Sequence, residues 1–389
     1  MKPVNSVLSR YGTTIFTTMS ALALEHGAVN LGQGFPDEEG PEAIRRAAAE
    51  AVLSGPNQYP PMRGMPELRQ AVADHDRRFY GLDVDWQTEV LVTSGATEAL
   101  VDCFLGLIEP GDEVVLLEPL YDSYLPMIER AGGVPSLVRL EPPDWRLPRR
   151  ALEAAFSSRT KLVVVNSPMN PLGKVFDESE LSFLARLLED CDAYAVCDEV
   201  YEHLVFDGQS HKPLMTLPGM RQRCLRIGSA GKTFSATGWK VGYVTGAPAL
   251  IDAVAGAHQF VTFTTPPNLQ KAVAAGLGQD AGYFRHLARA QQDKRDRLAA
   301  GLQAAGFDVL PSAGTYFLIA DAAPLGFTGS DEAFCRYLTA EAGVAAIPVS
   351  AFYHGPAPAG FVRFCFCKRD EVLDEAVARL RRHFRRAAP

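Results

Sequence analysis

Short apolar runs alternate with amphipathic stretches through the middle of the chain. Six runs rich in β-branched and aliphatic residues predict β-strands, at 89–93, 112–118, 161–166, 194–199, 224–229 and 241–246. Helical patterns such as 180–191 separate them, which is the rhythm of βαβ units. Because these runs are apolar on both faces, we expect an α/β fold whose largely parallel sheet is covered by helices on both sides.

After residue 285 the pattern changes and predicts a smaller α+β domain. The expected elements are a charged helix at 284–306, a strand at 315–320, a helix near 331–342, apolar segments at 344–352 and 361–366, and a final basic helix. Proline-rich pieces at 142–144 and 355–360 are typical of loops. Ligands of the larger domain are expected at the ends of its strands.

Composition narrows the functional classes. The net charge of −8 and the pI near 5.6 argue against nucleic acid or an anionic membrane as partner, because both require clustered positive charge. The N-terminal stretch lacks a signal-peptide pattern, and no apolar run has membrane-spanning length. Seven scattered cysteines indicate reduced thiols, so we expect a cytoplasmic protein acting on small molecules.

Cys365 and Cys367 could be taken for metal ligands. Alternation along a strand places both side chains on one face, and no partner pair completes a zinc set. We expect the two thiols to pack in the core and the chain to hold no metal.

The segment "IGSAGKTFSATGWKVGY" at 227–243 contains a lysine in a turn between two apolar strands. A phosphate-binding P-loop is excluded, because only two residues separate Gly228 from Gly231 where that motif needs four. Burial and the positive charge of Lys240 would both lower the pKa of Lys232. A neutral Lys232 amine can form a Schiff base with an aldehyde.

A second motif, "VTSGATEAL" at 92–100, predicts an anion site. Ser94, Gly95, Ala96 and Thr97 lie between a strand and a helix, where free N–H groups meet the positive end of the helix dipole. An ordinary N-cap with Glu98 in the first turn is the alternative.

Three further polar residues interrupt apolar strands or end them. Asp198 closes a strand and needs a cationic partner or a strong donor, although it could instead cap a following helix. Asn170 before Pro171 is extended and can direct its amide at a ligand, or can simply form a turn. Arg363 lies between aromatic residues, where it would bind a carboxylate or join a structural ion pair.

Together these residues resemble the class I aminotransferases, the fold-type-I enzymes that depend on pyridoxal phosphate. The similarity covers nearly the whole chain and is strongest to the kynurenine aminotransferase, glutamine transaminase K and cysteine-conjugate β-lyase group. The motifs that carry it are "NLGQGFPD" (30–37), "NQYPPMRGMPEL" (57–68), "NPLGKVF" (170–176), "DEVY" (198–201), "GSAGKTFSATGWKVGY" (228–243) and "AIPVSAFY" through "RFCF" (346–366).

The resemblance implies a role for each matching residue. Lys232 would bind the cofactor covalently and act as the catalytic base, and Asp198 would pair with the pyridine nitrogen. Tyr201 and Asn170 would contact the phenolic oxygen. The cofactor's ring and phosphate would be held by Tyr121, Gly95, Ala96, Thr97, Ser229, Lys240 and the partner subunit's Tyr59. The substrate would be held by Arg363, Gly34, Asn170 and Phe16.

The resemblance also implies a fold and an activity. The fold would contain a mostly parallel seven-stranded sheet at 45–285, a small domain at 286–389, and a segment at 1–44 that joins the small domain and a dimer arm. The activity would be ping-pong transfer of an amino group from an aromatic, methionine-like or glutamine-like L-amino acid to a 2-oxo acid, in a homodimer with shared sites. A β-lyase and an N-succinyldiaminopimelate aminotransferase are the alternatives. Lys240 in place of the commoner arginine, Thr97 and Phe16 depart from parts of the family, which leaves the side-chain specificity open.

Overall fold

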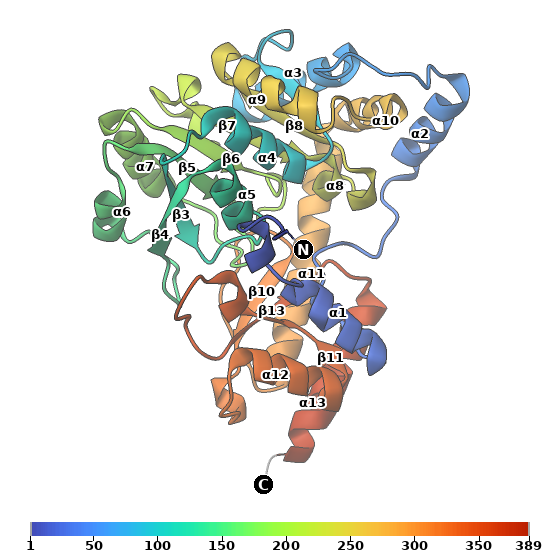
Figure 1. The fold of residues 1–389 in the computed structure, drawn as a ribbon. Helices are drawn as coiled ribbons and strands as arrows, with labels where there is room; N and C mark the ends of the chain where they lie inside the picture. Colours follow the sequence, from blue (N-terminus) through green and yellow to red (C-terminus); the bar gives the residue numbers. More distant parts are fainter. Residues whose placement is uncertain (1, 388–389) are drawn as a thin grey trace.

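The computed structural model describes residues 2–387, which form two lobes (Figure 1). The upper lobe contains a seven-stranded sheet of order β2-β8-β7-β6-β5-β3-β4. Its strands are β2 (Val90–Thr93), β3 (Glu113–Glu118), β4 (Val134–Arg139), β5 (Thr160–Asn166), β6 (Tyr194–Asp198), β7 (Cys224–Ser229) and β8 (Gly242–Gly246).

The sheet is mostly parallel, as the sequence predicted. The pairs β3–β4, β3–β5, β5–β6 and β6–β7 are parallel, whereas β8 runs antiparallel to both β2 and β7. The six predicted strands are confirmed, and β4 was missed. Pro135 and the exposed Val134 weaken the pattern of this edge strand, because an edge position needs neither full burial nor every N–H donor.

Helices cover both faces of this sheet (Figure 1). Alternate strand residues point to opposite faces, so Val92 belongs to the core that includes α2, α3, α7 and α10, while Leu91 belongs to the core that includes α4, α5 and α9. The helices of the upper lobe are α2 (Glu42–Ser54), α3 (Pro66–Tyr80), α4 (Ala96–Leu107), α5 (Tyr124–Ala131), α6 (Arg149–Ala155), α7 (Glu178–Asp190), α8 (Ala230–Thr233), α9 (Pro248–Val261) and α10 (Pro267–Leu277).

The lower lobe contains an antiparallel sheet of order β12-β13-β10-β9 and a parallel pair, β1–β11. Since β1 comes from the N-terminal segment, both ends of the chain build this lobe. Its strands are β1 (Val29–Asn30), β9 (Asp308–Val309), β10 (Phe317–Asp321), β11 (Val344–Ala345), β12 (Ile347–Pro348) and β13 (Phe361–Cys365). Its helices are α1 (Ile15–Glu25), α11 (Ala281–Ala304), α12 (Asp331–Tyr337) and α13 (Asp370–Ala387).

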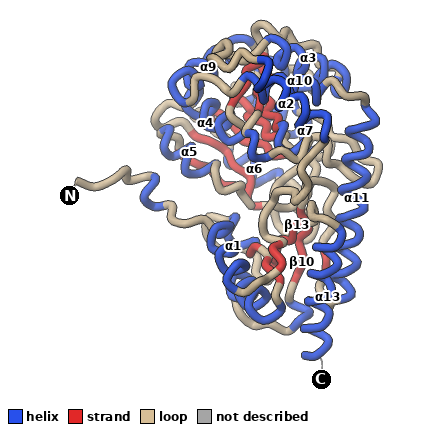
Figure 2. The backbone as a smooth tube through the Cα atoms, turned by 90° about the vertical axis from the view of Figure 1, so that its right-hand side faces the viewer, coloured by secondary structure: helices blue, strands red, loops and turns tan. Residues whose placement is uncertain are grey.

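Helix α11 runs along both lobes, and the segment before α1 extends away from them (Figure 2). The predicted domain boundaries stay a prediction, and residues 1 and 388–389, at their outer ends, lie outside the described residues. Short helical turns complete the chain at η1 (Leu8–Arg10), η2 (Leu214–Thr216), η3 (Met220–Gln222), η4 (Thr237–Trp239), η5 (Ala323–Leu325), η6 (Leu338–Ala342, a π-turn) and η7 (Val349–Phe352).

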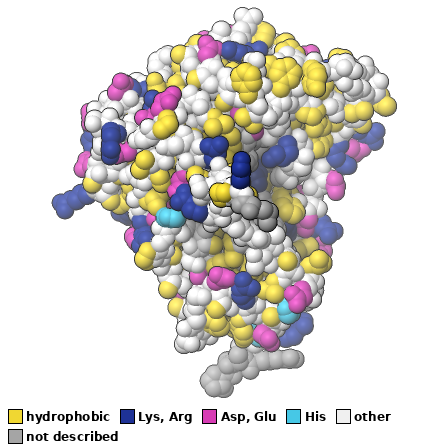
Figure 3. All heavy atoms as spheres, viewed as in Figure 1, with side chains coloured by type: hydrophobic (Ala, Val, Ile, Leu, Met, Phe, Trp, Pro, Cys, Tyr) yellow, Lys and Arg dark blue, Asp and Glu magenta, His cyan; other side chains and the backbone are white. Residues whose placement is uncertain are grey.

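The surface carries both signs of charge. Basic and acidic side chains are interspersed on the face shown in Figure 3. Within residues 2–387, none of the helices combines the length and the apolar character that crossing a membrane requires.

Candidate active site

A cavity of about 340 Å³ opens between the two lobes at the carboxyl ends of the parallel strands. This is where an open α/β sheet is expected to bind its ligand. The cavity brings together thirteen of the fourteen residues to which the family resemblance assigned a role: Phe16, Gly34, Gly95, Ala96, Thr97, Tyr121, Asn170, Asp198, Tyr201, Ser229, Lys232, Lys240 and Arg363. Tyr59 lies outside it and is 84% exposed.

Lys232 lies on the short helix α8, directly after β7. Its Nζ donates a hydrogen bond to the carbonyl oxygen of Gly34 at 2.9 Å, and the hydroxyl of Tyr316 donates to the Lys232 carbonyl at 2.7 Å. The first bond directs the side chain, and the second anchors the backbone of Lys232. Burial lowers the pKa of Lys232, and the charge of Arg363 acts in the same direction. The neighbouring cation that acts on Lys232 is Arg363.

Asp198 ends β6 and is buried beneath the cavity. Its Oδ2 accepts a hydrogen bond from the hydroxyl of Tyr124 at 2.6 Å, and its Oδ1 has a long contact of 3.5 Å with the N–H of Val200. Burial raises the pKa of Asp198, and the bond from Tyr124 opposes that rise. No helix begins at Asp198, so the N-cap alternative is wrong. Such a carboxylate can accept a further strong donor from the cavity.

Arg363 enters the cavity from β13 of the lower lobe. Its guanidinium donates to Asn170 Oδ1 at 2.9 Å and to the carbonyl oxygen of Gly32 at 2.6 Å, and it lies 3.9 Å from the ring centre of Phe317. Burial lowers its pKa to about 10. Its Nε has no hydrogen-bond partner, and among residues 2–387 Arg363 forms no salt bridge, although the carboxylate of Asp122 acts on its charge. The structural ion pair is therefore excluded for the described residues, which leaves the charge for a carboxylate ligand.

Asn170 takes part in this arrangement through its side chain. Its N–H donates to Asn166 Oδ1 at 2.8 Å, which fixes the backbone after β5. Because its amide oxygen faces Arg363, its amide nitrogen is left to donate to a ligand.

The N-terminus of α4 forms the opposite end of the cavity. Gly95 has φ of 81° and is the N-cap, with no side-chain hydrogen bond to close the helix end. A Cβ at Gly95 would lie 3.4 Å from Nζ of Lys240, so a cation faces the helix end. Ser94 does not belong to this anion site, because its hydroxyl contacts the Thr265 hydroxyl at 3.3 Å. The arrangement suits a phosphate.

The remaining predicted residues shape the walls. A Cβ at Gly34 would lie 2.6 Å from Phe317, so only glycine permits this close approach. The Phe16 ring lies 5.0 Å from the Arg363 guanidinium. Tyr121 meets Tyr124 edge to face at 5.6 Å.

Several residues of the site were missed. Tyr124, Tyr316 and Phe317 read as ordinary core positions, and Asp122 was passed over although it follows Tyr121 and lines the cavity. Their contacts depend on how distant strands meet. The available signal was a pair of tyrosines three residues apart, Tyr121 and Tyr124, in the turn that leads into α5.

The two cysteines of β13 and its end are buried together in the core of the lower lobe, as predicted. Their Sγ atoms lie 3.2 Å apart.

Comparison with known proteins agrees with this geometry. The model of the family "Aminotransferase class I and II" matches residues 27–380. A probable N-succinyldiaminopimelate aminotransferase of Mycobacterium tuberculosis is 47% identical, over 96% of this chain and 97% of its own. A methionine aminotransferase of Escherichia coli is 41% identical, over 97% of both chains.

Solved structures show the same likeness. The structure of N-succinyldiaminopimelate aminotransferase from Mycobacterium tuberculosis superposes with a TM-score of 0.95 at 47% identity, covering 97% of this chain and 99% of that one. With a family match over most of its length, this chain belongs to the class I and II aminotransferases.

Proposed function

We propose that this aminotransferase uses pyridoxal phosphate and moves an amino group from an L-amino acid to a 2-oxo acid by a ping-pong mechanism. The observation that carries the proposal is the cavity itself, which is lined by a lysine of lowered pKa, the buried carboxylate of Asp198 and the guanidinium of Arg363, whose hydrogen-bond acceptors are neutral oxygens. These three groups match the aldehyde, the pyridine nitrogen and the substrate carboxylate.

The residues present fit the cofactor. Asp198 has a free acceptor position for a protonated pyridine nitrogen, and Tyr201 and Asn170 have donors for the phenolic oxygen. Tyr121 lies where it can cover the ring. The phosphate would take the uncapped end of α4 and its surroundings, made of Gly95, Ala96, Thr97, Ser229 and Lys240.

When bound, the cofactor supplies an electron sink for the pair released at the substrate α-carbon. The chain itself positions the substrate and moves the proton. Arg363 binds the carboxylate, with the Gly34 backbone and Asn170 beside it. Lys232 Nζ then takes the proton from the α-carbon and delivers it again, held in place by the Tyr316 bond to its own carbonyl.

The walls favour an uncharged side chain on the donor. Phe16, Tyr121 and Phe317 make the cavity apolar, and its described lining offers no arginine besides Arg363. This supports an aromatic, methionine-like or glutamine-like donor over a dicarboxylate. N-succinyldiaminopimelate is the second candidate, favoured by the relative that is 47% identical.

A homodimer completes the proposal. Tyr59 and Phe260 are 84% and 86% exposed, and apolar side chains gather over α9 and α10 in Figure 3. A partner that covers this surface would place its Tyr59 at the phosphate. The seven cysteines are all free thiols, which supports a cytoplasmic location.

The decisive experiment uses the purified enzyme with a panel of amino donors and oxo acids, following oxo-acid formation. Lys232→Ala should abolish turnover, and borohydride reduction should fix a pyridoxyl group on Lys232 of the wild type alone, detected by peptide mass. Full transaminase activity in the variant, or no label on Lys232, would refute the assignment.

The same panel separates the candidate donors. Transamination of aromatic amino acids or methionine, with slow turnover of N-succinyldiaminopimelate, supports the first candidate. The reverse order of kcat/KM supports the second.

A further inference from the structure

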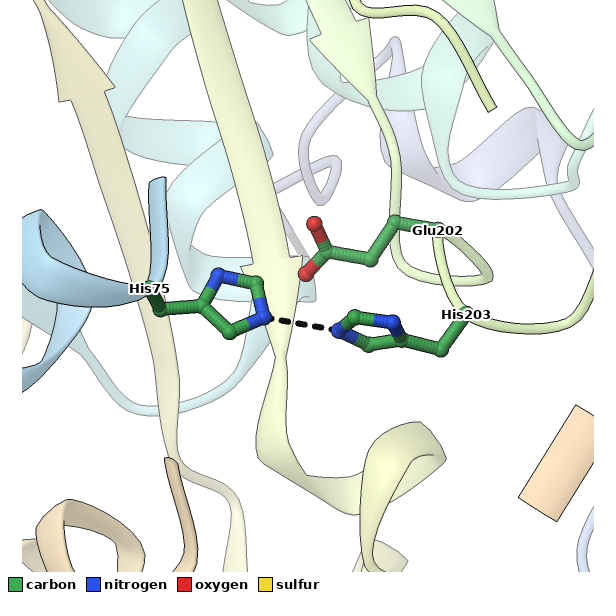
Figure 4. Close-up of side chains that lie close together, drawn as sticks. All are labelled: His75, Glu202 and His203. Carbon is green, nitrogen blue, oxygen red and sulfur yellow. Dashed lines mark hydrogen bonds between the residues drawn. The ribbon is translucent and has the colours of Figure 1, made fainter. Parts of the chain in front are cut away.

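A second polar cluster lies on the face of the large sheet that α3 covers, outside the cavity. His75 projects from α3, and Glu202 and His203 project toward it from the turn that follows β6 (Figure 4). The Nε2 atoms of His75 and His203 lie 2.7 Å apart, and the ligand atoms of all three residues lie within 4.8 Å of one another. The proposed amino-group transfer uses none of these side chains.

The side chains of this cluster have lone pairs that could bind a ligand. The Oε2 atom of Glu202 accepts hydrogen bonds from Tyr80 and Arg226, both at 2.6 Å, whereas its Oε1 has only a 3.3 Å contact with the Tyr243 hydroxyl. The Nδ1 atom of His75 has no hydrogen bond and lies 3.6 Å from Asp76 Oδ1. Asp76 therefore lies on the Nδ1 side of the His75 ring, where a proton on Nδ1 leaves the Nε2 lone pair for a metal.

The surrounding charges are unbalanced. Asp76, Glu199 and Glu202 all contact Arg226, and each of these four residues is at most 4% exposed. Three buried carboxylates therefore meet one guanidinium, and the histidine rings beside them, His75 and His211, add positive charge only when they are protonated. His211 also lies beside Glu199, at 3.0 Å. Buried charge of this size requires compensation, and a divalent cation supplies two positive charges at once.

We propose that His75 Nε2, His203 Nε2 and Glu202 Oε1 form a site for one divalent transition-metal cation of the zinc class. Two imidazoles and one carboxylate are a ligand set that suits such ions, with a fourth position left for water. Tetrahedral zinc places two Nε2 atoms about 3.3 Å apart, so the rings must separate by about 0.6 Å from their present contact. His203 is only partly buried, which gives the ion a route in.

The site would fasten α3 to the turn after β6. That turn also carries Tyr201, which precedes Glu202 and lines the active-site cavity. The cation would therefore stabilise the floor of the cavity without touching a substrate.

The test is metal binding by the full-length enzyme, saturated with pyridoxal phosphate and freed of metal by a chelator. Calorimetry with Zn²⁺ or Co²⁺ should show one equivalent bound, together with a rise in the unfolding temperature. His203→Gln should weaken the binding at least 100-fold and remove that rise. His286→Gln, which changes an exposed histidine on α11, should leave both unchanged.

A crystal soaked in Zn²⁺ provides a second readout that needs no variant. Anomalous scattering should place the ion between His75, Glu202 and His203. Absence of stoichiometric binding, unchanged affinity in His203→Gln, or an ion found only elsewhere would overturn the proposal and leave the two histidines as a hydrogen-bonded pair.

Discussion

Arg363 carries its charge into the cavity between two aromatic rings, with neutral oxygens as its only hydrogen-bond acceptors among the described residues. A planar guanidinium can stack on Phe317 while its edge binds a carboxylate, and an ammonium cannot do both. The position therefore demands arginine for its shape as much as for its charge.

Replacing this residue tests that argument. We expect Arg363→Lys to raise the KM for the amino donor about 10- to 100-fold, because a charged hydrogen bond contributes about 1.5–3 kcal/mol. The variant should still bind pyridoxal phosphate, because the substitution removes no residue that we assign to the cofactor. Steady-state kinetics measures the first effect, and an unchanged KM would contradict the carboxylate role.

From the sequence, we could predict which residues line the site, but we could not predict which of them contact one another. Lys232, Asp198 and Arg363 stand in local patterns that imply their chemistry, and the structure brings all three into one cavity. The bond from Tyr124 to Asp198 joins residues 74 positions apart, and the stacking of Phe317 on Arg363 joins two strands. Neither contact can be predicted from the local sequence pattern, because each depends on tertiary packing.

Among the elements, β8 shows why a glycine is needed next to the N-terminus of α4, where we propose that the phosphate binds. Gly242 pairs with Thr93 on one side and Ser229 on the other, and a Cβ there would lie 2.6 Å from the Gly95 backbone. The start of α4 could not remain in place beside a larger residue.

We therefore expect Gly242→Ala to weaken the affinity for pyridoxal phosphate by about tenfold or more, because shifted N–H groups lose part of the anion site. Gly256→Ala on α9, where a Cβ meets nothing within 4 Å, is the matched control. Cofactor titration followed by absorbance compares them. Equal affinities in the two variants would show that the N-terminus of α4 still binds the phosphate when residue 242 has a Cβ.

The side chain of His258 links α9 to α4. His258 contacts Glu98 Oε1 at 2.9 Å and Asp102 Oδ2 at 3.5 Å, and its other ring nitrogen lies 3.1 Å from the Met62 carbonyl oxygen. Burial opposes its charge, but the neighbouring carboxyl groups of Asp102 and Glu98 outweigh this effect and raise the pKa of His258 to about 9.

This raised pKa predicts how stability changes with pH. An unfolded histidine titrates near 6.5, so the folded state holds the proton more tightly, and this contribution is complete below about pH 6.5. It should be lost as the pH rises through about 9. The difference in unfolding temperature between the wild type and His258→Gln should therefore shrink from pH 7 to pH 10. A constant difference would contradict the proposed charge on His258.

The sequence predicted elements best where they are buried on both faces. Central strands such as β5 and β6 stood out, whereas β4 at the sheet edge did not. The helix expected at 331–342 is α-helical only to Tyr337 and then widens into a π-turn ending before Gly343. That widening depends on packing against α1 and α13, which a local pattern does not contain.

At the scale of the whole molecule, the proposed dimer makes one active site depend on two chains. Lys232, Asp198 and Arg363 line a single cavity of one chain, whereas Tyr59 lies outside it and contacts Phe263 with a ring separation of 5.6 Å. If Tyr59 serves the partner's phosphate, defects at Tyr59 and at Lys232 belong to different sites of the dimer. Defects at Asp198 and Lys232 belong to the same site.

Mixing variants separates these cases. Lys232→Ala and Tyr59→Ala, each nearly inactive at limiting pyridoxal phosphate, should regain activity when their subunits exchange, because each mixed dimer has one intact site. At full exchange of equal amounts, about one quarter of the sites should be intact. Lys232→Ala mixed with Asp198→Asn should regain nothing, because every mixed dimer keeps a defect in both sites. Recovery in the second mixture, or none in the first after exchange has been verified by native mass spectrometry, would show that Tyr59 does not cross the interface.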